Sequence, residues 1–252
     1  MEEIATQAFW LGLAKIIGVN IVLSGDNAVV IALAARSLPP KQQKLAILYG
    51  AGAAVVLRII LTVFAVALLA LPWLKIVGSL LLFWIGIKLL VPEEDDPDIN
   101  ASDHMLTAIK TILIADLVMS LDNVIGVAAA TGGSMTLLIL GLAISIPLVV
   151  FGAKLLVTLM ERFPVIITIG AALIGMVAGE MLVTDPVALD WMKGMANIQV
   201  AGGKPMLGGI NLELVAGAVG AAIVVAWGLW LAKRGEAAAE TSSDTKAQSG
   251  NS

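Results

Sequence analysis

The chain has 252 residues, of which 59% are hydrophobic and only 13% are charged, and its mean hydropathy is +0.98. Soluble domains carry roughly a quarter charged residues, so this composition indicates an integral membrane protein. The net charge of −4 comes largely from an acidic loop and the tail and says little about partners, and nucleic acid is not expected as a partner because no basic patch exists. With no cysteine and one histidine, His104, thiolate sites and imidazole clusters are excluded, so metal chemistry must use oxygen ligands.

Seven apolar runs are long enough to cross a bilayer core of about 30 Å, which needs roughly 20 helical residues. Polar residues, glycine or proline separate these runs. The predicted fold class is therefore all-α, a polytopic membrane protein with seven transmembrane helices, at residues 8–35, 45–70, 73–91, 105–130, 135–158, 162–183 and 212–232.

Lysine and arginine are concentrated in alternate loops and in the tail. The positive-inside rule therefore places the amino terminus outside and the carboxyl terminus in the cytoplasm of a bacterial plasma membrane. Residues 184–211 are expected to form an extracytoplasmic loop, with a candidate interfacial helix that puts Trp191 at headgroup depth. The tail, 233–252, has no apolar residue larger than alanine and is expected to be disordered.

An internal repeat relates the two halves of the chain. The element "VLSGDNAVVIALAA" of the first run returns as "VMSLDNVIGVAAA" in the fourth, and at the same offset Arg58 falls on Lys154. Each unit holds three helices, an odd number, so the second unit enters the membrane from the opposite side. The predicted organisation is an inverted repeat, with units 1–91 and 105–183, an acidic cytoplasmic loop 92–104 between them, and a seventh helix.

The repeated element carries carboxylates that are costly in a bilayer. An aspartate near the centre of a membrane helix costs on the order of 3 kcal/mol, so its retention points to function. Carboxylate, amide and hydroxyl oxygens suit Mg²⁺, Mn²⁺ or Ca²⁺ and suit copper and zinc poorly. The candidate cation site comprises Asp26, Asn27, Asp122 and Asn123, with Asn20, Ser24, Asp116 and Ser120 beside it. The alternative is structural: Arg58 and Lys154 neutralise two of the acids, and the polar groups hold helices together.

Helix periodicity raises a question about the first element. Asn20, Ser24 and Asn27 share one helix face, whereas Asp26 on an unbroken helix points about 120° away. The same spacing puts Asp116, Ser120 and Asn123 on one face of the fourth predicted helix. A helix break near Ser24 and Gly25 would bring the two directions together. If the helix is continuous, Asp26 and Asn27 face different partners.

The paired "SGDN" and "SLDN" helices of a seven-helix chain resemble the TerC family of integral membrane proteins. The resemblance implies export of a divalent metal, chiefly manganese, on a scaffold similar to LysE-like transporters. It also implies that Asp26, Asn27, Asp122 and Asn123 are the polar core positions and that Asp116 is a further acid. No enzymatic activity and no prosthetic group are expected, and the partners are the lipid bilayer and the transported cation.

The expected mechanism is alternating access between the two repeats. Charge balance remains open between two schemes. Asp116 or Glu180 takes up a proton as the ion leaves, or Arg58 and Lys154 occupy the empty site. Lys88, which pairs with Glu180 in the repeat, is a further candidate for coupling.

Three other functions are weighed against metal export. A LysE-like exporter of small cationic solutes and a membrane scaffold that transports nothing both fit the composition. An intramembrane aspartyl protease fits poorly, because the Gly-x-Gly-Asp and Tyr-Asp elements of such enzymes are absent.

Overall fold

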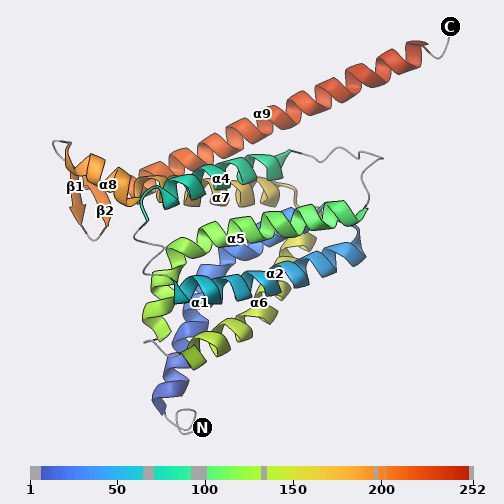
Figure 1. The fold of residues 1–252 in the computed structure, drawn as a ribbon. Coiled ribbons are helices and arrows are strands. Elements are labelled where there is room, and N and C mark those ends of the chain that lie inside the picture. The colour runs from blue at the N-terminus through green and yellow to red at the C-terminus, as the bar shows by residue number, and fades with distance from the viewer. Residues whose placement is uncertain are drawn as a thin grey trace.

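The computed structural model describes residues 7–64, 71–91, 101–131, 135–195, 198–201 and 203–249. Most of these residues are helical (Figure 1). The long helices are α1 (Gln7–Ala35), α2 (Pro40–Val63), α4 (Leu74–Leu90), α5 (Ala101–Thr131), α6 (Met135–Arg162), α7 (Val165–Val183) and α9 (Leu212–Ser249).

Five helices in the described part of the chain are long and apolar enough to cross a membrane. They cover Pro40–Val63, Ser102–Leu121, Ile139–Arg162, Val165–Val183 and Leu212–Gly235. The stretch Gly25–Ala35 of α1 is apolar but shorter, and α4 has 17 residues. The predicted class, a helical protein that crosses the membrane several times, is confirmed, while the number of seven spans stays a prediction.

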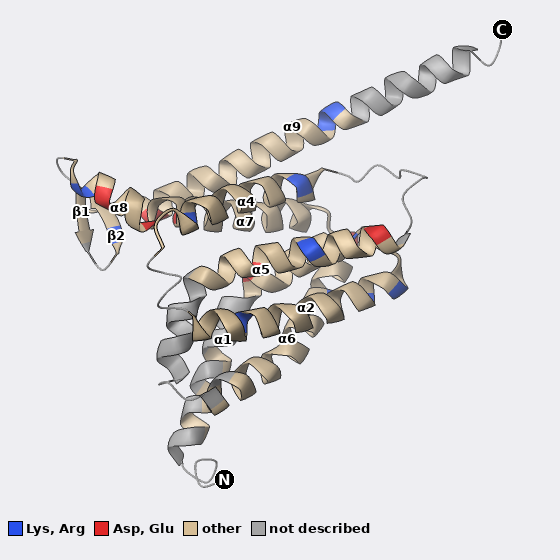
Figure 2. Cartoon of the chain, viewed as in Figure 1, with Lys and Arg blue, Asp and Glu red and all other residues tan. Residues whose placement is uncertain are grey.

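Many large apolar side chains are exposed on the described helices. Figure 2 shows that Lys, Arg, Asp and Glu are few along these helices. Phe151 is 68% exposed and Val165 is 63% exposed. Contiguous apolar surface of this kind is rare on proteins that are surrounded by water. The outer surface therefore fits a protein whose helices face lipid.

The long helices form two groups that lie side by side (Figure 1). The four-helix bundle consists of α1, α2, α5 and α6, and the three-helix layer consists of α4, α7 and α9. Contacts of α1 with α7 and of α4 with α5 join the two groups. Buried leucines and isoleucines such as Leu33, Leu82 and Ile112 fill the core between them.

Helix contacts follow the sequence repeat. The repeat pairs α1 with α5, α2 with α6, and α4 with α7. Helix α1 packs against α6, and the paired helices α5 and α2 pack against each other. Likewise α1 contacts α7, and their counterparts α5 and α4 are in contact. Exchange of the two repeats therefore preserves these contacts, and α9 stands outside the pattern.

The described residues between 184 and 211 form more regular structure than the expected loop. They contain α8 (Pro186–Lys193), which carries Trp191 with 71% exposure, and an antiparallel sheet of β1 (Ile198–Ala201), β2 (Lys204–Leu207) and β3 (Ile210–Asn211). Gly208 and Gly209 make the two-residue turn between β2 and β3 with φ angles of 54° and 87°. Glycine pairs favour this left-handed geometry, and the Gly-Gly pair was the sequence signal for the hairpin.

Two other helices differ from the expectation. Helix α1 runs through Ser24 and Gly25 without a break, so the broken-helix interpretation is wrong. Helix α9 continues to Ser249, where the sequence analysis expects a disordered tail from residue 233. The tail is rich in alanine and glutamate, which have high helix propensity, so it extends the helix once α9 has started.

Candidate functional site

A small cavity lies at the centre of the four-helix bundle, and all four helices of the bundle line it. Its volume is about 20 Å³, which accommodates roughly one particle of the size of a water molecule. We call it the central cavity. Its polar lining comes from Asn27 of α1, Arg58 of α2, Asp116 of α5 and Ser145 of α6.

Arg58 and Asp116 form a buried ion pair at the wall of the central cavity. The Nη2 atom of Arg58 donates to Oδ1 of Asp116 over 2.7 Å, and its Nε atom donates to Oγ of Ser120 over 3.0 Å. The Ser120 hydroxyl in turn donates to Oδ2 of Asp116 over 3.2 Å. Both carboxylate oxygens are therefore satisfied, which offsets the cost of burying the two charges.

Local sequence explains this geometry. Asp116 and Ser120 are one turn apart on α5 and so lie on the same face, as the sequence predicts. Helix α2 approaches that face closely at Gly50, where an added Cβ atom would lie only 2.9 Å from Ile112. The close approach brings the guanidinium of Arg58 to the polar face of α5.

The repeated Asp-Asn element of α1 places one of its two polar residues, Asn27, at the central cavity. Asn27 is 3% exposed and lines the central cavity. Asp26 is half-buried, and its Oδ1 atom accepts a hydrogen bond of 2.8 Å from the backbone N–H of Asn27. Asp26 lies within electrostatic reach of Arg58 and Asp116. The two residues thus have different surroundings, as a continuous helix requires.

The structure brings together five of the predicted site residues and leaves others apart. Asn27, Arg58 and Asp116 line the central cavity. Ser120 is hydrogen-bonded to Arg58 and Asp116, and Asp26 lies within electrostatic reach of the same two residues. Within the described residues, no group of three or more acidic or histidine side chains could hold a metal ion. The side chains of Asn20, Ser24, Asp122 and Asn123 lie outside the described part of the chain.

Lys154, the repeat counterpart of Arg58, has a different environment. It is exposed on α6, whereas Arg58 is 5% exposed on α2. The polar site is therefore asymmetric, although the contacts between helices follow the repeat.

Lys88 and Glu180 lie at opposite ends of the three-helix layer. Helices α4 and α7 are antiparallel, because Ser79 near the start of α4 donates to the carbonyl oxygen of Ala178 near the end of α7, over 2.7 Å. The Lys88 ammonium lies 5.5 Å from the centre of the Trp84 ring. Glu180 packs against Gly217 of α9. The structure does not bring this pair together.

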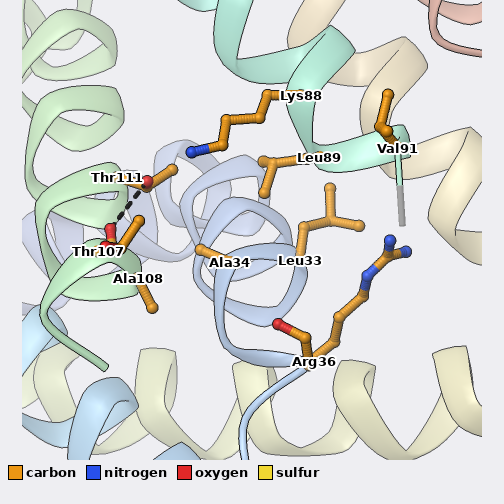
Figure 3. A pocket seen from close by; sticks show the side chains of 10 residues that line it. Leu33, Ala34, Arg36, Lys88, Leu89, Val91, Thr107, Ala108 and Thr111 are labelled. Atoms are coloured by element: carbon orange, nitrogen blue, oxygen red, sulfur yellow. Dashed lines mark hydrogen bonds between the residues drawn. The ribbon is translucent and has the colours of Figure 1, made fainter. Parts of the chain in front are cut away.

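Lys88 instead borders a second cavity of about 30 Å³, at the ends of α1 and α4 and the start of α5. Figure 3 shows its ammonium directed toward Thr111, with Arg36 on the other side of Leu33. Two positive side chains at one opening disfavour the entry of a cation. This cavity is therefore a poor candidate for the cation site.

Ser145 belongs to the central cavity, and the sequence analysis missed it. Its hydroxyl donates to the carbonyl oxygen of Gly141 over 2.8 Å, and it is 5% exposed. A serine two residues before Pro147 in an otherwise apolar run was the available signal.

Asp185, also missed, is fully buried between the starts of α4 and α8. Its carboxylate accepts backbone hydrogen bonds from Val187 (2.9 Å) and Lys75 (3.1 Å), and from Trp73 and Ile76 (3.4 Å each). Aspartate before proline is a typical start signal of a helix, so the capping of α8 was predictable. Its second role, at a helix more than 100 residues away, was not.

Comparisons with known proteins agree with this architecture. The model of the Integral membrane protein TerC family matches residues 5–236. "Uncharacterized membrane protein YjbE" of Bacillus subtilis is 44% identical over 177 residues, which cover 70% of this chain and 81% of that protein. "Uncharacterized membrane protein YceF" of the same organism is 26% identical, over 71% of this chain and 74% of that protein.

A longer relative matches over part of its length. "UPF0053 protein YegH" of Escherichia coli is 26% identical over 66% of this chain and 35% of that protein. No solved structure matches. Because the family model spans nearly the whole chain, including both Asp-Asn elements and the Arg58–Asp116 pair, the protein belongs to the TerC family of integral membrane proteins.

Proposed function

We propose that this protein exports a divalent cation through the central cavity, with Mn²⁺ as the favoured ion. The observation that carries the proposal is a cavity inside a membrane bundle, where a buried carboxylate, an amide and hydroxyl groups meet. Such hard oxygen donors match the ligand preference of Mn²⁺, Mg²⁺ and Ca²⁺. Manganese is favoured because of the family resemblance.

The size of the central cavity favours an ion over an organic solute. About 20 Å³ accommodates a single ion or water molecule and not a molecule of amino-acid size. A hydrated metal ion would also have to shed most of its water shell. The proposed site therefore selects by dehydration and by its oxygen ligands.

The proposed mechanism is alternating access by an inverted repeat of three plus three helices. Two observations support it: the Asp-Asn element recurs on α1 and α5, and the contacts between helices are preserved when the repeats are exchanged. Transporters with inverted repeats bind their substrates near the bilayer midplane, between the repeats. The proposal includes an outside amino terminus, a cytoplasmic carboxyl terminus and seven spans.

The test is metal flux by purified protein in liposomes, with Mn²⁺, Mg²⁺, Ca²⁺ and Zn²⁺ compared. Flux of Mn²⁺ is expected for the native chain and for the control variant Asp103→Asn, because Asp103 is exposed at the start of α5. Flux should fall at least about tenfold in Asp26→Asn and in Asp122→Asn, since each removes a charged ligand from the proposed site. A folded native protein that moves none of the four metals would refute the proposal.

A further inference from the structure

The described site already contains a cation. Arg58 projects from α2 to the polar face of α5 and donates to both Asp116 and Ser120. Its guanidinium satisfies the same carboxylate and hydroxyl that a transported ion would need. Neither Asp116 nor Ser120 is therefore available to an ion while Arg58 keeps this position.

The charges around the central cavity are compatible with the replacement of Arg58 by a metal ion. With Arg58 bound to Asp116, the charges of this ion pair cancel. If Arg58 withdrew, the Asp116 carboxylate would be left for a cation to bind, with the Asp26 carboxyl group within electrostatic reach. Either state avoids a bare carboxylate in the membrane, where an unpaired buried charge is strongly unfavourable.

We propose that Arg58 is a tethered competitor of the transported cation, which occupies Asp116 and Ser120 when the site is empty and withdraws when the ion binds. The inference rests on the transport function proposed above. It gives Arg58 a role in ion affinity and release, where a permanent structural pair would only stabilise the bundle. The long, flexible arginine side chain allows the guanidinium to move while the helices stay in place.

The asymmetry of the repeat agrees with this role. Lys154, at the equivalent position of the second repeat, is exposed on α6. One tethered cation therefore serves the described site. Lys154→Gln is the matched control, because it removes a positive charge at the equivalent position outside the central cavity.

A comparison of variants separates a competitor from a permanent pair. The readout is the half-saturating Mn²⁺ concentration for flux in liposomes. Arg58→Gln should lower this concentration at least about tenfold, because the ion no longer has to displace a cation. It should also slow turnover, because the ion is then released from a more negative site. Arg58→Lys keeps the charge but cannot reach Asp116 and Ser120 together, so we expect a smaller decrease. Lys154→Gln should change the concentration less than about twofold, since Lys154 does not line the central cavity.

The double variant Arg58→Gln/Asp116→Asn decides the question, because it preserves the net charge of the site. If Asp116 binds the ion after Arg58 withdraws, the double variant lacks a ligand, and its half-saturating concentration should be at least about tenfold above the native value. If Arg58 and Asp116 are permanently paired, the neutral replacement should behave as the native chain does. A double variant within about twofold of native would overturn the inference and leave the transport function standing. A native protein that moves no metal would overturn both.

Discussion

The four-helix bundle and the three-helix layer solve the same problem of helix association in opposite ways. The bundle buries an arginine, an aspartate and a serine that are joined by hydrogen bonds of 2.7 to 3.2 Å beside a cavity. The layer packs α7 against α9 through glycines, with backbone against backbone. Within the described residues, the bundle buries an ion pair, and the layer brings the backbones of α7 and α9 into direct contact.

This difference suggests separate roles for the two groups of helices, ion binding in the bundle and structural support in the layer. A buried charge network has alternative pairings, and a cavity gives it room to change. Close packing of backbones has neither, since any displacement creates collisions or voids. We therefore expect the bundle to carry ion binding and the layer to stay rigid. Three substitutions test this comparison.

The largest effect on stability is expected from breaking the ion pair of the bundle. Asp116→Leu leaves Arg58 buried without its carboxylate and should lower the free energy of unfolding by about 3–5 kcal/mol. The double variant Arg58→Met/Asp116→Leu should recover most of this loss, because it removes both charges. The measurement is the midpoint of thermal unfolding in detergent, monitored by tryptophan fluorescence. A double variant as unstable as Asp116→Leu would show that the charges themselves hold the bundle together.

A smaller loss is expected from disturbing the glycine contacts of the layer. A methyl group at position 179 would collide with the carbonyl oxygen of Ala216, and backbone has little freedom to move aside. Gly179→Ala should therefore separate α7 from α9 and cost about 3 kcal/mol. Thermal unfolding in the same detergent measures the change.

Gly52→Ala is the matched control in the four-helix bundle. An added Cβ atom at Gly52 meets no heavy atom within 4 Å, so only helix propensity should act. That term favours alanine by about 0.5–1 kcal/mol. If Gly179→Ala were as well tolerated as Gly52→Ala, the close backbone packing of α7 against α9 would not be what holds the layer together.

Sequence reasoning was most successful where one residue type carries a strong physical cost. Membrane helices follow from long apolar runs, and their predicted positions agree with the described helices to within a few residues at most ends. Asp116 and Ser120 were predicted to share a face because they are four residues apart on one helix, and they do. The partner of Asp116 was also predictable, since a buried carboxylate needs a cation and basic residues are scarce in the apolar runs.

Other features depend on tertiary contacts that no local pattern encodes. Lys88 and Glu180 are equivalent in the repeat but lie apart in space, because equivalent residues of an inverted repeat can lie at opposite ends of antiparallel helices. The break at Gly25 failed because glycine permits a break without requiring one. Arg58 and Lys154 are both basic residues in apolar runs, so the sequence does not distinguish them. Tertiary packing buries Arg58 and leaves Lys154 exposed.

The smallest of the three effects is expected at the edge of the layer, where Asp185 joins the starts of α4 and α8. Its removal leaves four backbone N–H groups without their acceptor, and one of them belongs to Trp73, which has a φ of 70°. Asp185→Ala should cost about 2 kcal/mol and speed hydrogen exchange at Lys75 and Ile76. Asp190→Ala, the matched control on α8, removes only an exposed ion pair with Lys193 and should cost less than about 1 kcal/mol. Exchange that speeds up only around α8 would mean that Asp185 caps its own helix alone and that α4 is held by its packing against α7.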